Sequence, residues 1–446
     1  MPKVFISFLG AIAYEKTQYY FDDKKQASSA TPYVQEAIFE KMLADIWTAE
    51  DKVFICTTDD AHEKNYINRV MFNTETKRFE HSPDKDGLKS VLDRLKTTGK
   101  ISHFDNIPIA NGNTVQEIWS VFEAIHTQLK GLPPQSEVYF DITYGFRSLP
   151  MLGIVLLNYI KTLYDVRVRY VFYGNFEVGR QERMAKIAQA KKEGQSPEDV
   201  KKLEATPPLS PILDLRPFVE LQEWTTAAQT FFSSGNAKLL AELTRPSNPV
   251  LADNLSDFTE AILTCRGKML THDLDVDSFK NLVALSQSTV YEAQLKPILE
   301  RVKKKLANFQ SENTKNGFAV VEWCIENGLI QQGFTFLQET AVSYVVESVY
   351  GKNELFNYAY RDAANTALNG FNKRKDRDNP METETRAMRA FVRTKVDLMP
   401  NYKKLTGSSG LRNDINHAGF KEHYASANDL RNELKNIYST IKQILA

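Results

Sequence analysis

The sequence is poor in cysteine and contains no long apolar run. Cys56, Cys265 and Cys324 are its three cysteines, and none belongs to a CxxC pair. Neither a disulfide framework nor a zinc site is indicated, so we expect no bound metal and a reducing, cytoplasmic compartment. The longest apolar stretch, LPMLGIVLLNYI, falls well short of the ~20 residues that a membrane-spanning helix needs. The amino terminus also lacks the features of a signal peptide, so no membrane role is expected.

A net charge is also missing. Lys plus Arg and Asp plus Glu number 56 each among the 446 residues, so any site for a polyanion must be a local patch. Two glycine signatures, G-x-G-x-x-G and G-x-x-x-x-G-K-[ST], are absent from the strand-to-helix turns. Their absence argues against a nicotinamide-binding fold and against a P-loop ATPase. The length of the chain predicts two or three domains.

Short β-rich runs alternate with helical segments in residues 1–180. The runs KVFISFL (3–9), KVFICTT (52–58), EVYFDIT (137–143) and VRYVFYG (168–174) are apolar, branched and aromatic, as strands buried on both faces should be. The segments between them carry apolar residues at helical spacing. This alternation predicts a mostly parallel sheet covered by helices, a Rossmann-like α/β arrangement.

The rest of the chain is predicted to be helical. Residues 181–208 are charged and weakly apolar, which favours an exposed helical insertion or linker. From residue 209 onward strand-like runs largely disappear and helical periodicity recurs. Residues 209–446 are therefore expected to form an all-helical domain, with an exposed loop at 372–385. The predicted fold class is α/β plus all-α.

Loops at the ends of strands form the first candidate site, because ligands collect at the carboxyl ends of parallel strands. In DITYGFRSLP, Gly145 lets the backbone approach a ligand and Arg147 can pair with phosphate. Tyr144 or Phe146 can stack on a base. The corresponding loops elsewhere hold Gly10 after the first strand, and Asn111, Gly112, Asn113 and Thr114 before a later helix. Ordinary helix capping requires the same residue types, so binding and capping both remain open here.

The second candidate site lies in LRNDINHAGF (411–420), where Arg412 and His417 are five positions apart. On a regular helix this spacing separates the two side chains in angle. An interrupted helix, or a second copy across a dimer axis, can bring them together. A metal-independent ribonuclease needs a proton-exchanging group and a fixed cation, which histidine and arginine supply. Asn413 can orient the substrate or His417. Two unrelated surface residues are the alternative interpretation.

Both segments resemble known families. RNDINH fits the Arg-(Asn/His)-x-x-x-His pattern of HEPN ribonucleases, which are helical RNA-cleaving domains. ISFLG and DITYGFRSLP resemble the CARF domain of CRISPR-associated proteins, a Rossmann-like sensor of cyclic oligoadenylates. SPILDLRPFVELQEWTTAAQTFFSSGNA and VVEWCIENGLIQQGFTFLQETAVSYVVE are similar to the helical region of the Csx group of CARF-HEPN effectors. The likeness covers most of the chain apart from the charged insertion.

The resemblance implies a type III CRISPR ancillary ribonuclease. A cyclic oligoadenylate, with cyclic tetra-adenylate as the first expectation, would bind at a CARF dimer interface and activate cleavage of single-stranded RNA by paired HEPN domains. No other cofactor and no metal are implied, and the chain would be a homodimer or a higher homo-oligomer. The residues that match the HEPN motif are Arg412, Asn413 and His417. The candidate ligand contacts are Gly10, Ala11, Asn111, Gly112, Asn113, Thr143, Tyr144, Gly145, Phe146 and Arg147.

The sequence departs from the family after SFLG, where a small or Thr-Gly pair is usual and Ala11 and Ile12 stand instead. This departure affects the identity of the ligand rather than its binding. One alternative function is a non-catalytic CARF sensor that binds a partner or nucleic acid through its helical domain. Another is a Rossmann-type metabolic enzyme with a helical appendage, which the missing glycine signature disfavours.

Overall fold

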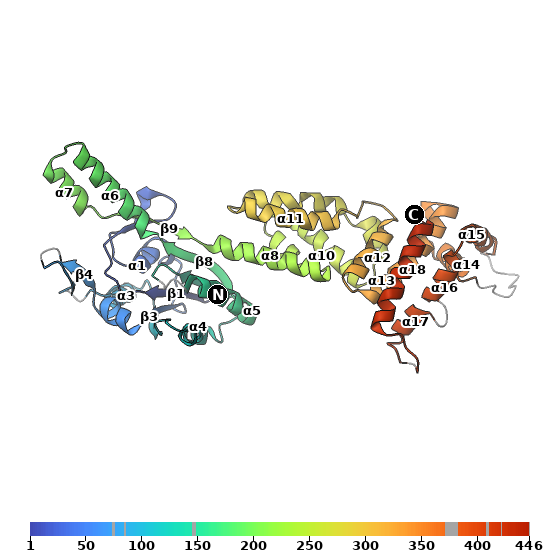
Figure 1. Ribbon diagram of the computed structural model, residues 1–446, viewed down its shortest axis with the longest axis horizontal. Helices are drawn as coiled ribbons and strands as arrows, with labels where there is room; N and C mark the ends of the chain where they lie inside the picture. The colour runs from blue at the N-terminus through green and yellow to red at the C-terminus, as the bar shows by residue number, and fades with distance from the viewer. Residues whose placement is uncertain are drawn as a thin grey trace. The chain divides into compact units, whose positions relative to one another are not determined.

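The computed structural model describes residues 1–73, 76–83, 86–144, 149–370, 382–406, 410–420 and 422–445. The chain divides into two compact units, Met1–Glu220 and Leu221–Ala446. Figure 1 shows strands in the first unit and helices in the second. Each unit is considered by itself below.

A seven-stranded sheet forms the centre of the first unit. Its strands run in the order β2-β9-β8-β7-β1-β3-β6, and every neighbouring pair is parallel except β8 and β9. The four strands predicted from the sequence are confirmed as β1, β3, β7 and β8. The bounds are β1 (Lys3–Leu9), β2 (Gln18–Tyr20), β3 (Lys52–Thr57), β6 (His103–Pro108), β7 (Glu137–Asp141), β8 (Arg167–Gly174) and β9 (Leu209–Asp214), while β4 (Val70–Asn73) and β5 (Arg78–His81) form a separate hairpin.

Helices cover both faces of the sheet because the strand side chains alternate between two cores. Val4, Ile6 and Phe8 of β1 pack with α4 (Val115–Leu129) and α5 (Leu149–Tyr164). Phe5 and Leu9 point to the other face. That face is covered by α1 (Val34–Ile38), the adjoining π-helical turn η2 (Phe39–Leu43) and α3 (Leu88–Thr97). Burial on both sides explains why these strands read as continuous apolar runs.

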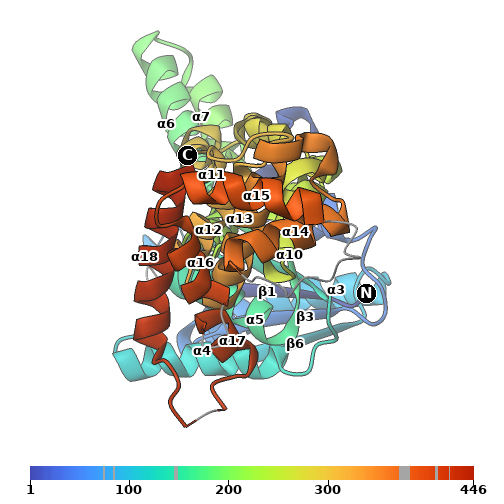
Figure 2. The same ribbon diagram turned by 90° about the vertical axis from the view of Figure 1, so that its right-hand side faces the viewer.

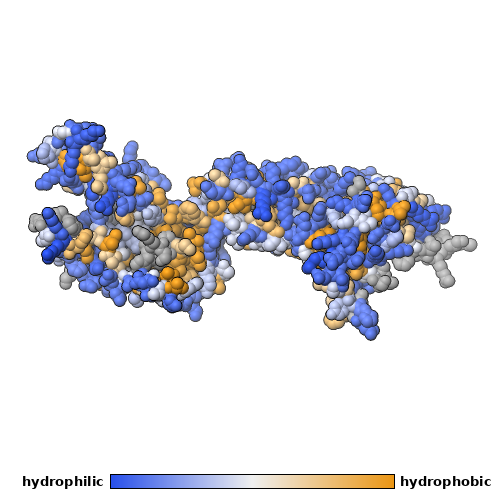
Figure 3. All heavy atoms as spheres, viewed as in Figure 1, coloured by the Kyte–Doolittle hydropathy of each residue, from blue (hydrophilic) through white to orange (hydrophobic). Residues whose placement is uncertain are grey.

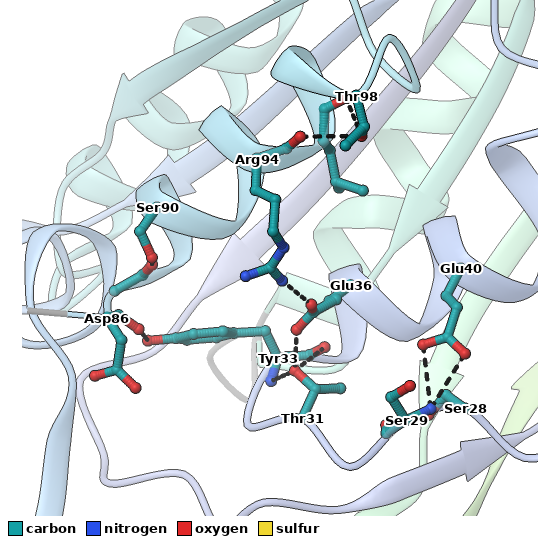
Figure 4. Close-up of polar contacts among 12 residues, drawn as sticks. Ser28, Ser29, Thr31, Tyr33, Glu36, Glu40, Asp86, Ser90, Arg94 and Thr98 are labelled. Carbon is teal, nitrogen blue, oxygen red and sulfur yellow. Dashed lines mark hydrogen bonds and ion pairs between the residues drawn. The ribbon is translucent and has the colours of Figure 1, made fainter. Parts of the chain in front are cut away.

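A polar network ties α1 to the segment before it and to α3 (Figure 4). The Glu36 carboxylate accepts a hydrogen bond from the Thr31 hydroxyl (2.5 Å) and contacts the Arg94 guanidinium on α3. The Glu40 carboxylate accepts hydrogen bonds from the Ser29 amide at 3.1 and 3.2 Å. Two carboxylates of one short helical segment therefore fix the path of residues 28–31, which connect β2 to α1.

The charged segment, predicted to be an exposed helical insertion or linker, contains two helices that pack on each other. Its helices are α6 (Phe176–Lys192) and α7 (Pro197–Ala205). The sequence prediction placed residue 209 at the start of the helical domain, but β9 lies in the sheet, where it pairs with β8 and β2. The first unit consequently extends to Glu220, within α8 (Arg216–Ser234). Strand β9 forms because its backbone pairs with strands that are distant in the sequence. The local sequence pattern carries no signal of that pairing.

Helices make up the second unit around one core. They are α9 (Lys238–Thr244), α10 (Pro249–Leu263), η4 (Met269–Asp273), η5 (Val276–Ser288), α11 (Glu292–Leu306), α12 (Asn316–Glu326), α13 (Ile330–Tyr350), η6 (Lys352–Glu354), α14 (Tyr358–Asn369), α15 (Glu382–Thr394), α16 (Leu398–Thr406), α17 (Leu411–Asn416) and α18 (Ala427–Leu445). In Figures 1 and 2, α18 lies alongside α16, and it also contacts α12 and α13. Of the loop predicted at 372–385, residues 372–381 lie outside the described part, and α15 begins at Glu382.

Across the described residues, no helix has the length and apolar character required to cross a membrane.

Candidate functional site

The loop after β1 is fixed by side chains from nearby residues. The Gly10 amide donates a hydrogen bond of 2.6 Å to the Tyr14 hydroxyl. The Asn65 side-chain amide donates to the carbonyl oxygens of Gly10 (2.8 Å) and Ile12 (2.7 Å). A Cβ at position 10 would lie 2.8 Å from the Tyr14 hydroxyl oxygen. Glycine is therefore required here by the close approach of Tyr14.

The end of β7 holds a buried carboxylate that organises the neighbouring loop. Asp141 accepts hydrogen bonds from the Ser7 hydroxyl (2.5 Å), and from the hydroxyl (2.5 Å) and amide (3.0 Å) of Thr143. The Thr143 hydroxyl oxygen in turn accepts from the Gly174 amide at 2.8 Å. Burial raises the pKa of Asp141 to about 6, and the hydrogen bonds from Ser7 and Thr143 oppose this rise. Three strand ends are thus joined through one carboxyl group.

Aromatic rings connect the two loops. The Tyr14 and Tyr144 rings are stacked with centroids 4.1 Å apart. The Tyr144 hydroxyl donates to the Pro32 carbonyl (3.2 Å) and lies 3.3 Å from the Tyr19 hydroxyl. Burial, together with the neighbouring tyrosines, raises the Tyr144 pKa well above its ordinary value, so its hydroxyl stays protonated. Phe176 completes the group, with its ring centroid 6.5 Å from that of Tyr144.

These rings line a cavity of about 180 Å³. Ile12, Glu15, Glu177 and Arg180 also line it, and Glu15 is paired with Arg183. Arg180 is exposed and has no ion-pair partner among the residues that the structure describes. The cavity is smaller than the ~300–1,000 Å³ typical of a whole small-molecule site. Its size and lining suit one flat ring beside an anionic group.

The structure assembles only part of the predicted ligand set. Gly10, Thr143 and Tyr144 meet at the strand ends, and Ala11 lies in the same turn. Asn111, Gly112 and Asn113 follow β6, which is separated from β1 by β3. There the Asn113 amide donates to Glu117 and the Thr114 hydroxyl caps α4, so helix capping accounts for this loop. Gly145, Phe146 and Arg147 lie outside the described residues.

Sequence reasoning missed Tyr14, Tyr19, Phe176 and Arg180. The first two belong to the aromatic run AYEKTQYYF directly after the first strand, and Phe176 follows the strand that ends at Gly174. Aromatic residues just beyond a strand end were the available signal.

In the second unit, Arg412 points inward from α17. Its Nη1 donates a hydrogen bond of 2.6 Å to the Gln338 side-chain oxygen on α13. The charge of Arg412 also acts on Cys265 and Tyr402: burial raises the pKa of both groups, and the guanidinium partly offsets that rise. Arg412 is thus half-buried at the junction of α13, α16 and α17.

His417 lies at the carboxyl end of α17 and is exposed, as is Asn413. The chain turns immediately afterwards through Ala418 (φ 53°) and Gly419 (φ 69°). Within the described residues 410–420, no hydrogen bond joins the side chains of Arg412 and His417. Within one protomer, Arg412 is therefore held against α13 by Gln338, and His417 lies at the exposed end of α17.

Among the residues that the structure describes, no group of three or more His, Cys, Asp or Glu side chains has an arrangement that could hold a metal ion.

Comparison with known families decides the identity of the first unit. Residues 4–177 match the model of the CARF domain of the CRISPR system endoribonuclease Csx1. Residues 220–314 match the second domain of CRISPR-associated protein MJ1674. The first unit is a CARF domain of the kind found in CRISPR-associated proteins. The Tyr14–Tyr144 cavity lies in this CARF domain.

A curated relative is CRISPR-associated protein MJ1674 of Methanocaldococcus jannaschii, which is 21% identical over 352 residues. The alignment covers 76% of this CARF protein and 50% of the relative, so the chain spans about half the length of the relative it matches. A solved structure, Enterococcus italicus Csm6 bound to cyclic hexa-2'-fluoro-hexa-dAMP, is similar at 12% identity with a TM-score of 0.43, covering 100% of this chain and 94% of that one.

Proposed function

We propose that this CARF protein is a cyclic-oligoadenylate-activated endoribonuclease of type III CRISPR antiviral defence. Its CARF domain binds the activator, and its helical unit cleaves single-stranded RNA without a metal. The match of residues 4–177 to the CARF domain of an endoribonuclease carries the proposal. The RNDINH motif, which lies at α17 and ends at His417, supports it.

The CARF cavity suits one repeat of a cyclic oligoadenylate. An adenine ring can pack against the aromatic wall of Tyr14, Tyr144 and Phe176. Arg180 supplies a cation for the adjoining phosphate. Because the cavity has room for only part of a ring, the remaining nucleotides need a second copy of the site. A symmetric ring and a symmetric dimer meet this requirement, with cyclic tetra-adenylate as the first ligand to test.

The helices α4 and α5 offer a surface for such a dimer. Val115, Trp119, Met151 and Val155 are all more than half exposed on these helices. Figure 3 shows hydrophobic atoms at the surface of the first unit. Exposed apolar side chains in a group mark an interaction surface. The proposal requires that the α4–α5 face packs against the same face of a second protomer.

Cleavage would use the 2'-hydroxyl of the RNA as the nucleophile. The 2'-oxygen attacks the adjacent phosphorus, the bond to the 5'-oxygen breaks, and the products carry a 2',3'-cyclic phosphate and a 5'-hydroxyl. His417 exchanges the proton, Arg412 offsets the charge on the phosphate, and Asn413 orients the substrate. In this proposal, the working site combines Arg412 and His417 side chains from two protomers. An isolated protomer is expected to be nearly inactive.

The test is cleavage of a labelled RNA containing all four bases, in EDTA, with and without cyclic tetra-adenylate or cyclic hexa-adenylate. Wild type, His417→Ala and His423→Ala are compared, because His423 is an exposed histidine close to the motif. We expect ligand-dependent cutting that is lost only in His417→Ala. If a ring binds but no variant cuts RNA, the chain is a non-catalytic sensor. If cutting continues in His417→Ala, the assignment of His417 is overturned.

A further inference from the structure

Three adjoining hollows form a groove on the second unit. Their volumes are about 590, 540 and 540 Å³. The first and second share Thr314 and Thr340, and the second and third share Cys265 and Lys268. The walls come from η4, the start of α12, one face of α13 and the turn before α14. We call this continuous depression the α12–α13 groove.

The middle hollow of the groove lies next to Arg412. Thr335 and Glu339 line the groove from α13. Gln338, which binds the Arg412 guanidinium, is on the same helix between them. Cys265 also lines the groove and lies within the electrostatic reach of Arg412. The groove therefore leads to the guanidinium that the proposed cleavage mechanism uses.

Unpaired cations are spread along the groove. Arg266, Lys315 and Lys352 are exposed, line it, and have no ion-pair partner in the described part of the chain. Two further cations are neutralised, Lys268 by Asp273 (3.6 Å) and Arg361 by Glu339 (2.6 Å). Glu347 also lines the groove and opposes this positive charge. Three separated cations against one such carboxylate favour an extended polyanion over a single phosphate.

An aromatic side chain stands among these charges. Phe356 lines the middle hollow and is 48% exposed. The His272 ring lies edge-to-face against it with centroids 4.8 Å apart, and the Lys268 ammonium is 5.2 Å from its centroid. An exposed ring beside cations is the arrangement on which unpaired bases stack. Bases in a duplex are already stacked and paired, so this feature selects single strands.

We propose that the α12–α13 groove binds single-stranded RNA, with Arg266, Lys315 and Lys352 contacting phosphates and Phe356 stacking on a base, and guides the strand to Arg412. The delivery of RNA to Arg412 rests on the proposed function, because it requires that Arg412 belongs to the cleavage site. Binding itself is independent of cleavage. The two claims can therefore fail separately.

The experiment measures fluorescence anisotropy of a labelled single-stranded RNA in which every 2'-hydroxyl is methylated, so that it cannot act as a nucleophile. The full chain is titrated with and without the cyclic oligoadenylates. The groove variant combines Arg266→Glu, Lys315→Glu and Lys352→Glu. The matched control combines Lys296→Glu, Lys304→Glu and Lys435→Glu, which makes the same charge change at exposed positions outside the groove.

We expect the groove variant to bind about tenfold or more weakly, with a reduced dependence on salt, while the control binds like wild type. Phe356→Leu should weaken binding about fivefold, and Tyr358→Leu, an 83% exposed neighbour outside the groove, should not. Equal losses in the groove variant and its control, or equal binding of a duplex of the same sequence, would overturn the groove. If the wild type binds RNA but does not cut unmethylated RNA, only the proposed ribonuclease activity is overturned.

Discussion

The Tyr14 ring stacks on the Tyr144 ring with centroids 4.1 Å apart and planes inclined by 30°. This contact joins the loop after β1 to the loop after β7. The Tyr14 hydroxyl also accepts a hydrogen bond from the Gly10 amide, and the Tyr144 hydroxyl donates one to the Pro32 carbonyl. A ligand that displaces either ring therefore moves both loops. The pair is the part of the CARF cavity through which binding would be transmitted to the strand ends.

Removing the Tyr14 hydroxyl should destabilise the first unit although the ring stack is kept. Tyr14→Phe leaves the half-buried Gly10 amide without its acceptor, which costs about 1 kcal/mol. Urea unfolding followed by circular dichroism measures this change. Tyr159→Phe is the control, because Tyr159 is 42% exposed. Equal unfolding free energies for the two variants would contradict the role of the Tyr14 hydroxyl.

Asp141 should make stability depend on pH. Burial raises its folded pKa to about 6, against an ordinary value near ~4. The stabilising effect of the protonated form is complete below the ordinary pKa and is lost as the pH rises through about 6. The side-chain amide introduced by Asp141→Asn stays neutral at every pH. The free energy of unfolding of the variant, relative to that of wild type, should therefore increase by on the order of 2 kcal/mol between pH 4.5 and pH 8. Unfolding free energies at both pH values measure the gain. A pH-independent difference would show that Asp141 is ionised throughout.

The main strands and helices of the first unit could be predicted from the sequence. The strands β1, β3, β7 and β8 and the helices between them carry strong local patterns, because both faces of the sheet are buried. β6 was missed, since HFDNIP lies at the edge of the sheet and is largely polar. β9 was missed because pairing with distant β8 and β2 determines it.

The candidate sites were predictable only as positions on the chain. Gly10 and Tyr144 follow directly from strand ends, but their connection through Tyr14 depends on a turn that only the fold specifies. In the same way, the Arg412 motif is visible in the sequence, while its partner Gln338 lies 74 positions away. Side-chain partners at such separations are set by tertiary packing rather than by local pattern.

Gln338 should position Arg412 for cleavage without touching the substrate itself. Gln338→Leu removes the hydrogen bond to Nη1, and the guanidinium loses its fixed orientation. On the proposed mechanism, kcat should fall about tenfold with little change in KM, because the interaction lost is made in the transition state. Steady-state cleavage at saturating activator measures both constants. Gln331→Leu, an exposed change on the same helix, is the control. A rise in KM alone would assign Gln338 to substrate binding.

Charge on the α4–α5 face should weaken the proposed dimer and, with it, ligand-activated cleavage. Trp119 is 60% exposed and Val155 is 54% exposed, and Trp119→Glu with Val155→Glu would place like charges opposite each other across a symmetric interface. Sedimentation velocity should then show a dimer for wild type and a monomer for the double variant. Ligand-activated cleavage by the variant should fall at least tenfold at low protein concentration. Raising the concentration should restore part of the activity, because a weakened dimer re-forms by mass action. This recovery distinguishes an assembly defect from a damaged active site. The double variant keeps its cleavage residues and should regain activity as the concentration rises, whereas His417→Ala should not. A double variant that stays dimeric and fully active would place the interface elsewhere.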